Sequence, residues 1–469
     1  MKRRLRVYKK TVSIVNETAT GMYESLVGDK KGFLLESYDK NYDRYTFFGK
    51  EPEEIISSRG NALVITKNDG TQEVRNGNPL ERLKEYYSAF DIVKDNEELS
   101  FSGGLVGNLG YDFVRYAEVL PDNNPDEIGI ETVQMMLMTK FIMVDHVAET
   151  LTGIILGEDT PEGRKKSLEE AEELIRQALA NKGRAPEKNF THDGVIVNQS
   201  DSLEQYSQKV EKIKEYIREG HIFQTVLSQR WTIETKQSGF ELYKELRELN
   251  PSPYLYYFNY GDFEVIGSSP EMIVKQQGNR VYTCPIAGTR KRGADAEEDA
   301  LLRDELLQDE KERAEHVMLV DLARNDMGRI SEFGTVKVTQ FMEVQNYSHV
   351  MHIVSMVEGR KKGEFHPLDL VSSFLPAGTL SGAPKIRAME IIDELESVRR
   401  GLYGGATGYI DFSGDMDFCI TIRTMIKKGK RVYLQAGAGI VADSIPENEY
   451  QECCNKVMAL AKTLMHYIH

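Results

Sequence analysis

Short runs of alternating apolar and polar residues, separated by Gly, Asn and Asp, dominate the first 144 residues of the chain. Such alternation predicts strands with one buried face, and the intervening residues favour tight turns. Strands joined by short turns pair as antiparallel hairpins. We therefore expect antiparallel sheet from the N-terminus to about Val144. The clearest of these runs are FLLES, RYTFFG, ALVITKNDGTQEV and GGLVGNLGYDF.

Helical periodicity appears further along the chain. One helix is expected at 161–182, and a second begins after Ser202, a suitable cap, and ends at Gly220. Further helices are expected at 295–327, 384–398 and 446–467, and strand clusters at 254–283, 334–358 and 405–441. Because strand hairpins follow one another without a helix between them, the predicted fold class is α+β, with large antiparallel sheets in a layered sandwich flanked by helices.

The chain of 469 residues, 40% hydrophobic, exceeds one ordinary core, so either two domains or one large layered domain is expected. A polar stretch near 183–194 is expected to be a linker or long surface loop. We therefore expect a β-rich N-terminal region, 1–185, packed intimately against a second region, 195–469.

The net charge of −15 argues against nucleic acid or an anionic membrane as the main partner, so an anionic substrate needs local positive charge. No apolar run is long enough to span a bilayer. The four cysteines, Cys284, Cys419, Cys453 and Cys454, show neither metal-ligand spacing nor a disulfide framework. These features predict a cytoplasmic protein.

Two acidic pairs, Glu312 with Glu315 and Glu449 with Glu452, fall in segments that read as helix. Residues three apart share one helical face, so each pair presents two carboxylates in one direction. If the two helices meet, the four carboxylates suit a hard divalent cation such as Mg²⁺. The alternative is that both pairs are solvated helix faces, since Asp and Glu number 74 in this chain.

The expected last helix also carries Lys456 on the face of its acidic pair, with Ser444 as its expected cap. Just upstream, Gly437, Ala438 and Gly439 end a strand, where small residues let a ligand approach backbone N–H groups. A plain glycine-rich turn explains the same spacing.

Three residues in apolar surroundings are further candidates. Glu271 is able to act as a general acid if burial keeps it protonated, although a salt-bridged edge-strand Glu is the alternative. His352 alternates with apolar residues, and a satisfied core histidine is its alternative. Arg423 lies in the apolar segment FCITIRTMI, where a guanidinium needs a carboxylate from the protein or from a substrate.

The second half of the chain carries eight ordered strings, and they belong to a resemblance that covers nearly the whole chain and is strongest from about Ser200 onward: NPSPYLYYF, GSSPE, PIAGTRKRG, ERAEHVMLVDLARND, LPAGTLSGAPK, YGGATGYIDF, IRT and AGAGIVADSIPENEYQEC. Together they resemble the chorismate-utilising enzymes, in particular the large subunits (component I) of anthranilate synthases. The resemblance implies antiparallel sheets flanked by helices, with the active site in a cleft between sheet layers. It assigns catalysis to 195–469 and regulation to 1–185.

Carried over residue by residue, the resemblance implies that Mg²⁺ is bound directly by Glu315 and Glu452, with Glu312 and Glu449 nearby. Mg²⁺ and Lys456 would hold the ring carboxylate of chorismate. The enolpyruvyl side would contact Arg423, Tyr403 and the backbone of Gly437, Ala438 and Gly439. Glu271 would protonate the departing C4 hydroxyl as ammonia adds at C2. The same site would be lined by Thr379 and by His352, which would assist the later elimination of pyruvate.

Two positions separate sister activities within this resemblance. Gln224 occupies the place where isochorismate and salicylate synthases carry a lysine that activates water, and an amide cannot act as that base. Ala287 stands where many aminodeoxychorismate synthases carry a lysine able to attack the ring. Both residues favour ammonia addition at C2.

The string FLLES resembles the tryptophan-binding element of anthranilate synthase, which implies feedback inhibition at a site distinct from catalysis. Glu36 and Ser37 would hold tryptophan together with Pro253 and Tyr254, and Arg44 would add a contact. A strand that ends in polar residues at a turn is the alternative for the first two residues.

Ammonia needs a source, and none of the four cysteines has the Gly-flanked setting of a glutaminase nucleophile. We therefore expect a separate glutamine amidotransferase subunit, with free ammonia able to replace it. Two other functions stay open: component I of an aminodeoxychorismate synthase, and a non-catalytic regulatory partner that responds to tryptophan.

Overall fold

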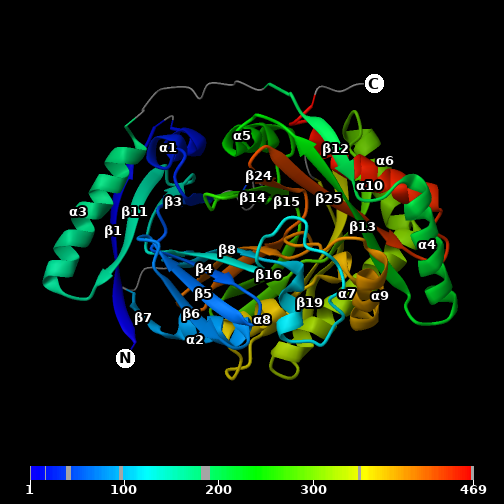
Figure 1. The fold of residues 1–469 in the computed structure, drawn as a ribbon, viewed down its shortest axis with the longest axis horizontal. Helices are drawn as coiled ribbons and strands as arrows, with labels where there is room; N and C mark the ends of the chain where they lie inside the picture. The colour runs from blue at the N-terminus through cyan, green and yellow to red at the C-terminus, as the bar shows by residue number, and fades with distance from the viewer. Residues whose placement is uncertain are drawn as a thin grey trace.

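The computed structural model describes residues 2–15, 17–37, 44–94, 99–180, 191–346 and 350–465. Within them the chain forms two sheets of 13 and 12 strands, antiparallel except where β1 pairs with β7, and helices cover the sheets on either side (Figure 1). The predicted α+β class with large antiparallel sheets is confirmed.

The first sheet contains, in spatial order, β12 (Val195–Gln199), β13 (Gln224–Glu234), β25 (Arg431–Ile440), β24 (Thr424–Lys428), β15 (Glu264–Ser269), β14 (Tyr254–Asn259), β2 (Gly32–Glu36), β3 (Tyr45–Lys50), β10 (Lys140–Asp145), β11 (Thr150–Glu158), β1 (Arg3–Ser13) and β7 (Phe90–Val93), with β21 (Gly382–Ala383) beside β13. The second contains β18 (Ile286–Lys291), β20 (Val350–Arg360), β17 (Arg280–Thr283), β16 (Met272–Gln277), β23 (Met416–Ile420), β22 (Ala406–Asp411), β8 (Gly104–Leu109), β9 (Val133–Met138), β4 (Glu54–Ser58), β5 (Ala62–Lys67) and β6 (Gln72–Asn76), with β19 (Lys337–Asn346) beside β20.

Each sheet combines strands from both expected regions. In the first sheet β2 pairs with β14, and in the second β8 pairs with β22, so backbone hydrogen bonds join the two parts of the chain. The boundary between the two regions stays a prediction. Most of the linker expected near 183–194, namely 183–190, lies outside the described residues.

The helices are α1 (Ala19–Leu26), α2 (Pro79–Ser88), α3 (Pro161–Ala178), α4 (Leu203–Arg218), α5 (Gly239–Leu249), α6 (Ala296–Gln308), α7 (Glu310–Ile330), α8 (Pro367–Phe374), α9 (Lys385–Leu395) and α10 (Pro446–Ala461), with 3₁₀ turns η1 (Tyr111–Tyr116) and η2 (Gly378–Leu380). None of the described helices combines the length and the apolar character needed to cross a bilayer. The cytoplasmic location stays a prediction.

Capping explains where the observed helices differ from the expected ones. Ser202 caps α4 as expected, through a reciprocal box with Gln205. The single helix expected at 295–327 is two helices, because the Asp309 carboxylate accepts hydrogen bonds from the first N–H groups of α7. Ser444 does not cap α10, because its Oγ accepts from the backbone N–H of Val441 at 3.1 Å. Within the first 144 residues α1 and α2 were not expected.

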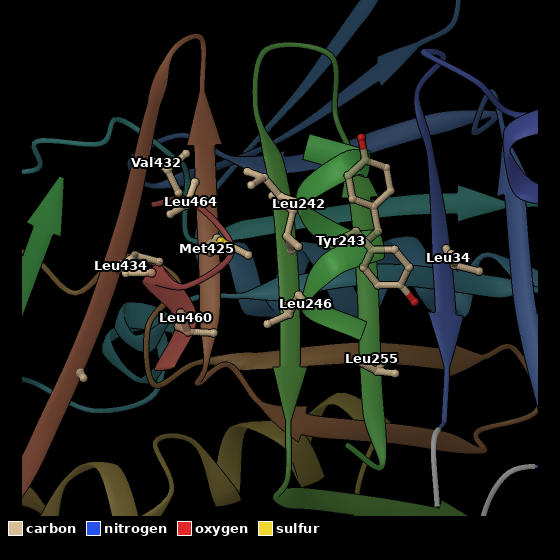
Figure 2. Close-up of a cluster of buried hydrophobic side chains, with 14 of the residues drawn as sticks. Leu34, Leu242, Tyr243, Leu246, Leu255, Met425, Val432, Leu434, Leu460 and Leu464 are labelled. Carbon is tan, nitrogen blue, oxygen red and sulfur yellow. The ribbon is translucent and has the colours of Figure 1, made fainter. Parts of the chain in front are cut away.

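Each sheet is apolar on both faces, which produces three packed layers. On β2, Leu34 faces the layer beneath α1, α3, α4, α5 and α10, while Phe33 faces a layer between the sheets. A third layer lies between the second sheet and α2, α7 and α8. Figure 2 shows the first of these layers, where Leu242 and Leu246 of α5 lie between Leu255 on one side and Met425 on the other. The stacked sheets place loops between them that carry the candidate site.

Candidate active site

Glu271 lies where the chain passes from the first sheet to the second, between Ser269 of β15 and Met272 of β16. Its side chain is buried, and Thr379 Oγ1 of η2 donates a hydrogen bond to Glu271 Oε1 at 2.9 Å. Burial raises the pKa of the Glu271 carboxyl from 4.5 to about 8, although Thr379 and the charges of Arg423 and Lys456 act in the opposite direction. This carboxyl is therefore largely protonated at neutral pH.

Arg423 lies on a second passage between the sheets, from β23 to β24. The two passages are hydrogen-bonded to each other: Ser268 N donates to Arg423 O at 3.1 Å, and Ile420 N donates to Glu271 O at 3.0 Å. Arg423 has a φ of +49°, a left-handed conformation that costs an L-residue energy and is common at functional sites. The charge of its guanidinium acts to lower the pKa of Glu271, which places the two side chains near each other.

His352 lies on β20, opposite the irregular strand β18. Its Nδ1 lies 3.0 Å from the carbonyl oxygen of Gly288, and because a carbonyl only accepts, Nδ1 carries the proton and Nε2 is the basic nitrogen. Burial, together with the charge of Arg423, lowers the pKa of His352 to about 4, although the hydrogen bond with Gly288 acts in the opposite direction. His352 is therefore a neutral base at pH 7. Ala287 precedes Gly288, at the point where the β18–β20 register shifts.

Strand β25 supplies the small residues expected to face a ligand. Gly437, Ala438 and Gly439 pair with Ser228, Leu227 and Val226 of β13. Cβ atoms added to the two glycines would lie 3.0 Å from Tyr403 Oη at Gly437 and 2.6 Å from Gln224 Nε2 at Gly439. Lys456 Nζ of α10 donates to the carbonyl oxygen of Gly437 at 2.9 Å. The structure thus brings Gln224, Tyr403 and Lys456 to the same glycine-bearing strand.

The two acidic pairs converge, although α7 and α10 are far apart in sequence. Burial raises the pKa of Glu315, and the neighbouring charges of Glu312 and Glu452 raise it further. Burial also raises the pKa of Glu449, with a contribution from Glu452. A divalent cation between these carboxylates would reduce their mutual repulsion. Carboxylate oxygens are also ligands of the chemical type that Mg²⁺ prefers.

The side chains nevertheless do not form a closed cage. Glu452 pairs with Lys456 at 2.7 Å, and Glu312 pairs with Arg290 at 3.4 Å. Among the described residues no group of three or more acidic, His or Cys side chains is arranged to hold a metal ion. Metal binding at these glutamates therefore stays a prediction.

A cavity of about 170 Å³ lies between the two sheets, and Glu36, Ser37, Pro253 and Tyr254 line it as expected for a shared site. Ser37 Oγ is buried and has no hydrogen-bond partner among the described residues. Sequence patterns did not predict the other residues that line the cavity, because these residues come from segments far apart in the chain and share no motif. They include Tyr45, Phe47, Ser100, Cys284, Tyr409, Asp417 and Cys419.

Two predicted contacts of this cavity are arranged differently. The Glu36 carboxylate accepts hydrogen bonds from Tyr243 Oη and from Arg247 Nε, both on α5. These hydrogen bonds hold the carboxylate on the face of β2 that α5 covers. Arg44 pairs with Asp145 at 3.1 Å and is not among the described residues that line the cavity. The roles of both residues stay predictions.

Comparison with known proteins agrees with this arrangement. The chorismate binding enzyme family matches residues 33–462. Anthranilate synthase component 1 of Acetivibrio thermocellus is 44% identical over 96% of this chain and 93% of its own, and that of Bacillus subtilis is 42% identical over 92% and 87%.

Solved structures show the same fold. Anthranilate synthase component I of Streptococcus pneumoniae aligns with a TM-score of 0.78 and 39% identity over 89% of this chain and 92% of that one. The isochorismate synthase MenF of Escherichia coli aligns with a TM-score of 0.72 over 98% and 95%, and its 18% identity supports the fold alone. The chain belongs to the anthranilate synthase component 1 family of chorismate-binding enzymes.

Proposed function

We propose that this protein is the large subunit of an anthranilate synthase, which aminates chorismate at C2 with ammonia and eliminates pyruvate to give anthranilate. The observation that carries the proposal is the buried carboxyl of Glu271, which accepts a hydrogen bond from Thr379 at 2.9 Å and lies near the charges of Arg423 and Lys456. A reaction that expels a hydroxyl group from a dianion needs an acid, local positive charge and exposed backbone N–H groups.

In the first step ammonia adds at C2 of chorismate and the C4–oxygen bond breaks. Glu271 gives its proton to the leaving oxygen, so that water departs and the carboxylate remains beside Arg423 and Lys456. Thr379 holds Glu271 Oε1 in place at 2.9 Å. Arg423, Tyr403 and the backbone of Gly437–Gly439 would bind the enolpyruvyl side of the substrate.

In the second step the C2 proton is removed and the bond from the ring to the enolpyruvyl oxygen breaks, which completes the aromatic ring and releases the enolate of pyruvate; the enolate then takes up a proton to become pyruvate. The neutral His352 is suited to accept that proton at Nε2. Mg²⁺, which would be held by Glu315 and Glu452 with Glu312 and Glu449 nearby, would supply positive charge to the ring carboxylate together with Lys456.

Gln224 and Ala287 support ammonia as the nucleophile. Gln224 lies against Gly439, where an amide cannot activate water as a lysine would. Ala287 has no group that attacks the ring. The relatives named above favour anthranilate over the aminodeoxychorismate alternative. The catalytic assignment also speaks against a purely regulatory partner.

The relatives are named as component 1, which implies a complex of more than one component. We infer that the second component is a glutamine amidotransferase. Burial raises the pKa of the Cys284 and Cys453 thiols to about 12 and raises those of Cys419 and Cys454, so none of the four is poised as the thiolate nucleophile of a glutaminase.

Tryptophan is proposed to bind in the cavity between the sheets. Aromatic walls from Tyr45, Phe47 and Tyr409 suit an indole ring, and Ser37 Oγ, which has no hydrogen-bond partner within the described part of the chain, is available to a polar group of the ligand. Because this cavity differs from the one beside Glu271 and Thr379, inhibition would be allosteric.

The function is tested by incubating the purified chain with chorismate, Mg²⁺ and an ammonium salt. Fluorescent anthranilate should form, and the product should have the mass of anthranilate without a lyase being added. An aminated product that needs a separate lyase to lose pyruvate would identify the aminodeoxychorismate alternative. No amination by folded protein would refute the proposal.

A further inference from the structure

Glu396 and Arg400 form an ion pair that is almost completely enclosed, with 3% and 1% of their side chains exposed. Arg400 Nε donates to Glu396 Oε2 at 2.9 Å, and Arg400 Nη2 donates to Oε1 at 2.6 Å. Oε1 also accepts from the N–H and the hydroxyl of Ser228 at 2.8 and 2.7 Å. A buried ion pair is seldom more stable than an apolar pair of similar volume, so stability alone does not account for it.

The other donors of Arg400 reach the backbone of two segments of the proposed site. Arg400 Nη1 donates to the carbonyl oxygen of Leu380 at 2.5 Å, and Nη2 donates to that of Val226 at 2.8 Å. Leu380 directly follows Thr379, the donor to Glu271. Val226 is the β13 partner of a glycine on β25. Each hydrogen bond therefore fixes a residue next to one that faces the substrate.

The flat faces of the Arg400 guanidinium contact two tyrosine rings. Its carbon lies 4.6 Å from the ring centre of Tyr111 and 5.7 Å from that of Tyr403. Tyr403 is the residue whose hydroxyl lies beside Gly437. One planar, fork-shaped cation thus contacts three segments of the site, an arrangement that a lysine cannot reproduce.

We propose that Arg400, held by Glu396, is a positioning residue that fixes η2, strand β13 and Tyr403 relative to one another for the reaction. The inference rests on the proposed function, and Arg400 itself is not assigned a contact with the substrate. Without it, the turn that carries Thr379 loses its anchor at Leu380. The hydrogen bond that holds down the pKa of Glu271 then weakens.

The test replaces both charges at once, as Arg400→Met with Glu396→Leu, so that no charge is left buried and unpaired. The matched control is Arg115→Met with Asp393→Leu. That pair is also largely enclosed, at 3.0 Å, but its other side-chain hydrogen bonds go to Asp112, Pro121 and Asn123, none of which belongs to the three segments that Arg400 contacts. Thermal unfolding and anthranilate formation are measured for both double variants and for wild type.

We expect both double variants to fold, and kcat to fall at least tenfold only in the Arg400 variant. In a plot of kcat against pH, the basic limb of the Arg400 double variant should move to higher pH, as it should in Thr379→Val. The other groups near Glu271, which are Cys284, Arg423 and Lys456, are the same in all variants and do not cause the shift. Arg400→Lys should not restore kcat, because a lysine lacks the fork; restoration would mean that only the charge matters.

Equal kcat and an unmoved pH profile in the two double variants would overturn the positioning role. If the Arg400 double variant does not fold, the positioning role is tested with Arg400→Lys instead. Its kcat and its kcat against pH profile are then measured below the melting temperature of that variant. Wild-type protein that forms no anthranilate would instead refute the proposed function, so the two failures are distinguishable.

Discussion

The buried carboxyl of Glu271 makes the stability of this protein depend on pH in a way that one substitution should remove. Its pKa is about 8 in the folded protein and 4.5 in the unfolded chain. Between these values the folded state keeps the proton and the unfolded state releases it, so the free energy of unfolding falls as pH rises. The stabilisation is complete below pH 4.5 and is lost as pH rises through 8, at about 1.4 kcal/mol per pH unit.

Glu271→Gln keeps the shape and the acceptor for Thr379 but cannot ionise. Between pH 5.5 and 7.5 the wild-type protein should lose about 3 kcal/mol of unfolding free energy relative to the variant. Urea unfolding at both pH values, without substrate, measures the difference, and Glu310→Gln on the exposed start of α7 is the control. Parallel curves for wild type and Glu271→Gln would refute the assigned environment. Turnover of the variant should fall by about 10²–10⁴-fold, the usual contribution of a general acid.

The remaining predictions concern the metal, the substrate and the inhibitor. Glu315→Gln with Glu452→Gln should weaken Mg²⁺ binding at least tenfold in calorimetry, whereas Glu310→Gln should not; unchanged affinity would misplace the metal. Gly439→Ala should raise the KM for chorismate about tenfold in initial rates, because its Cβ meets Gln224 Nε2, whereas Gly363→Ala, with open space around it, should have no effect. Ser37→Ala should weaken tryptophan binding by about 1–1.5 kcal/mol with turnover unchanged, and Ser413→Ala should bind tryptophan normally; equal affinities would place the inhibitor elsewhere.

Periodicity predicted the parts of the site that lie on regular elements. The spacing of Glu312 and Glu315 and of Glu449 and Glu452 placed each pair on one helical face, and the helices converge as expected. The break at Asp309 was missed because an acidic residue in an acidic helix has the same periodicity whether it caps or continues the helix.

Residues whose importance comes only from tertiary contacts were not predictable in this way. Glu396 and Arg400 follow an ordinary helix and a turn, and nothing local shows that they are buried or that Arg400 reaches Val226 and Leu380. The Glu36 carboxylate, whose contact with tryptophan stays a prediction, is directed by strand alternation toward α5. That direction follows from Leu34 on the same face of β2, once the sheet order is known.

The two passages between the sheets offer a physical route by which a ligand in the distant cavity would influence the proposed catalytic residues. Pro270 and Met272, which flank Glu271, line the cavity assigned to tryptophan, while the Glu271 side chain borders a separate small cavity with Thr379. The second passage starts near Cys419, another wall residue, and carries Arg423. If the two sheets adopt more than one arrangement relative to each other, a ligand that binds one arrangement more tightly increases the population of that arrangement. Because hydrogen bonds join the two passages, such a shift would move Glu271 and Arg423 together, and the proposed inhibition would require no contact between tryptophan and chorismate.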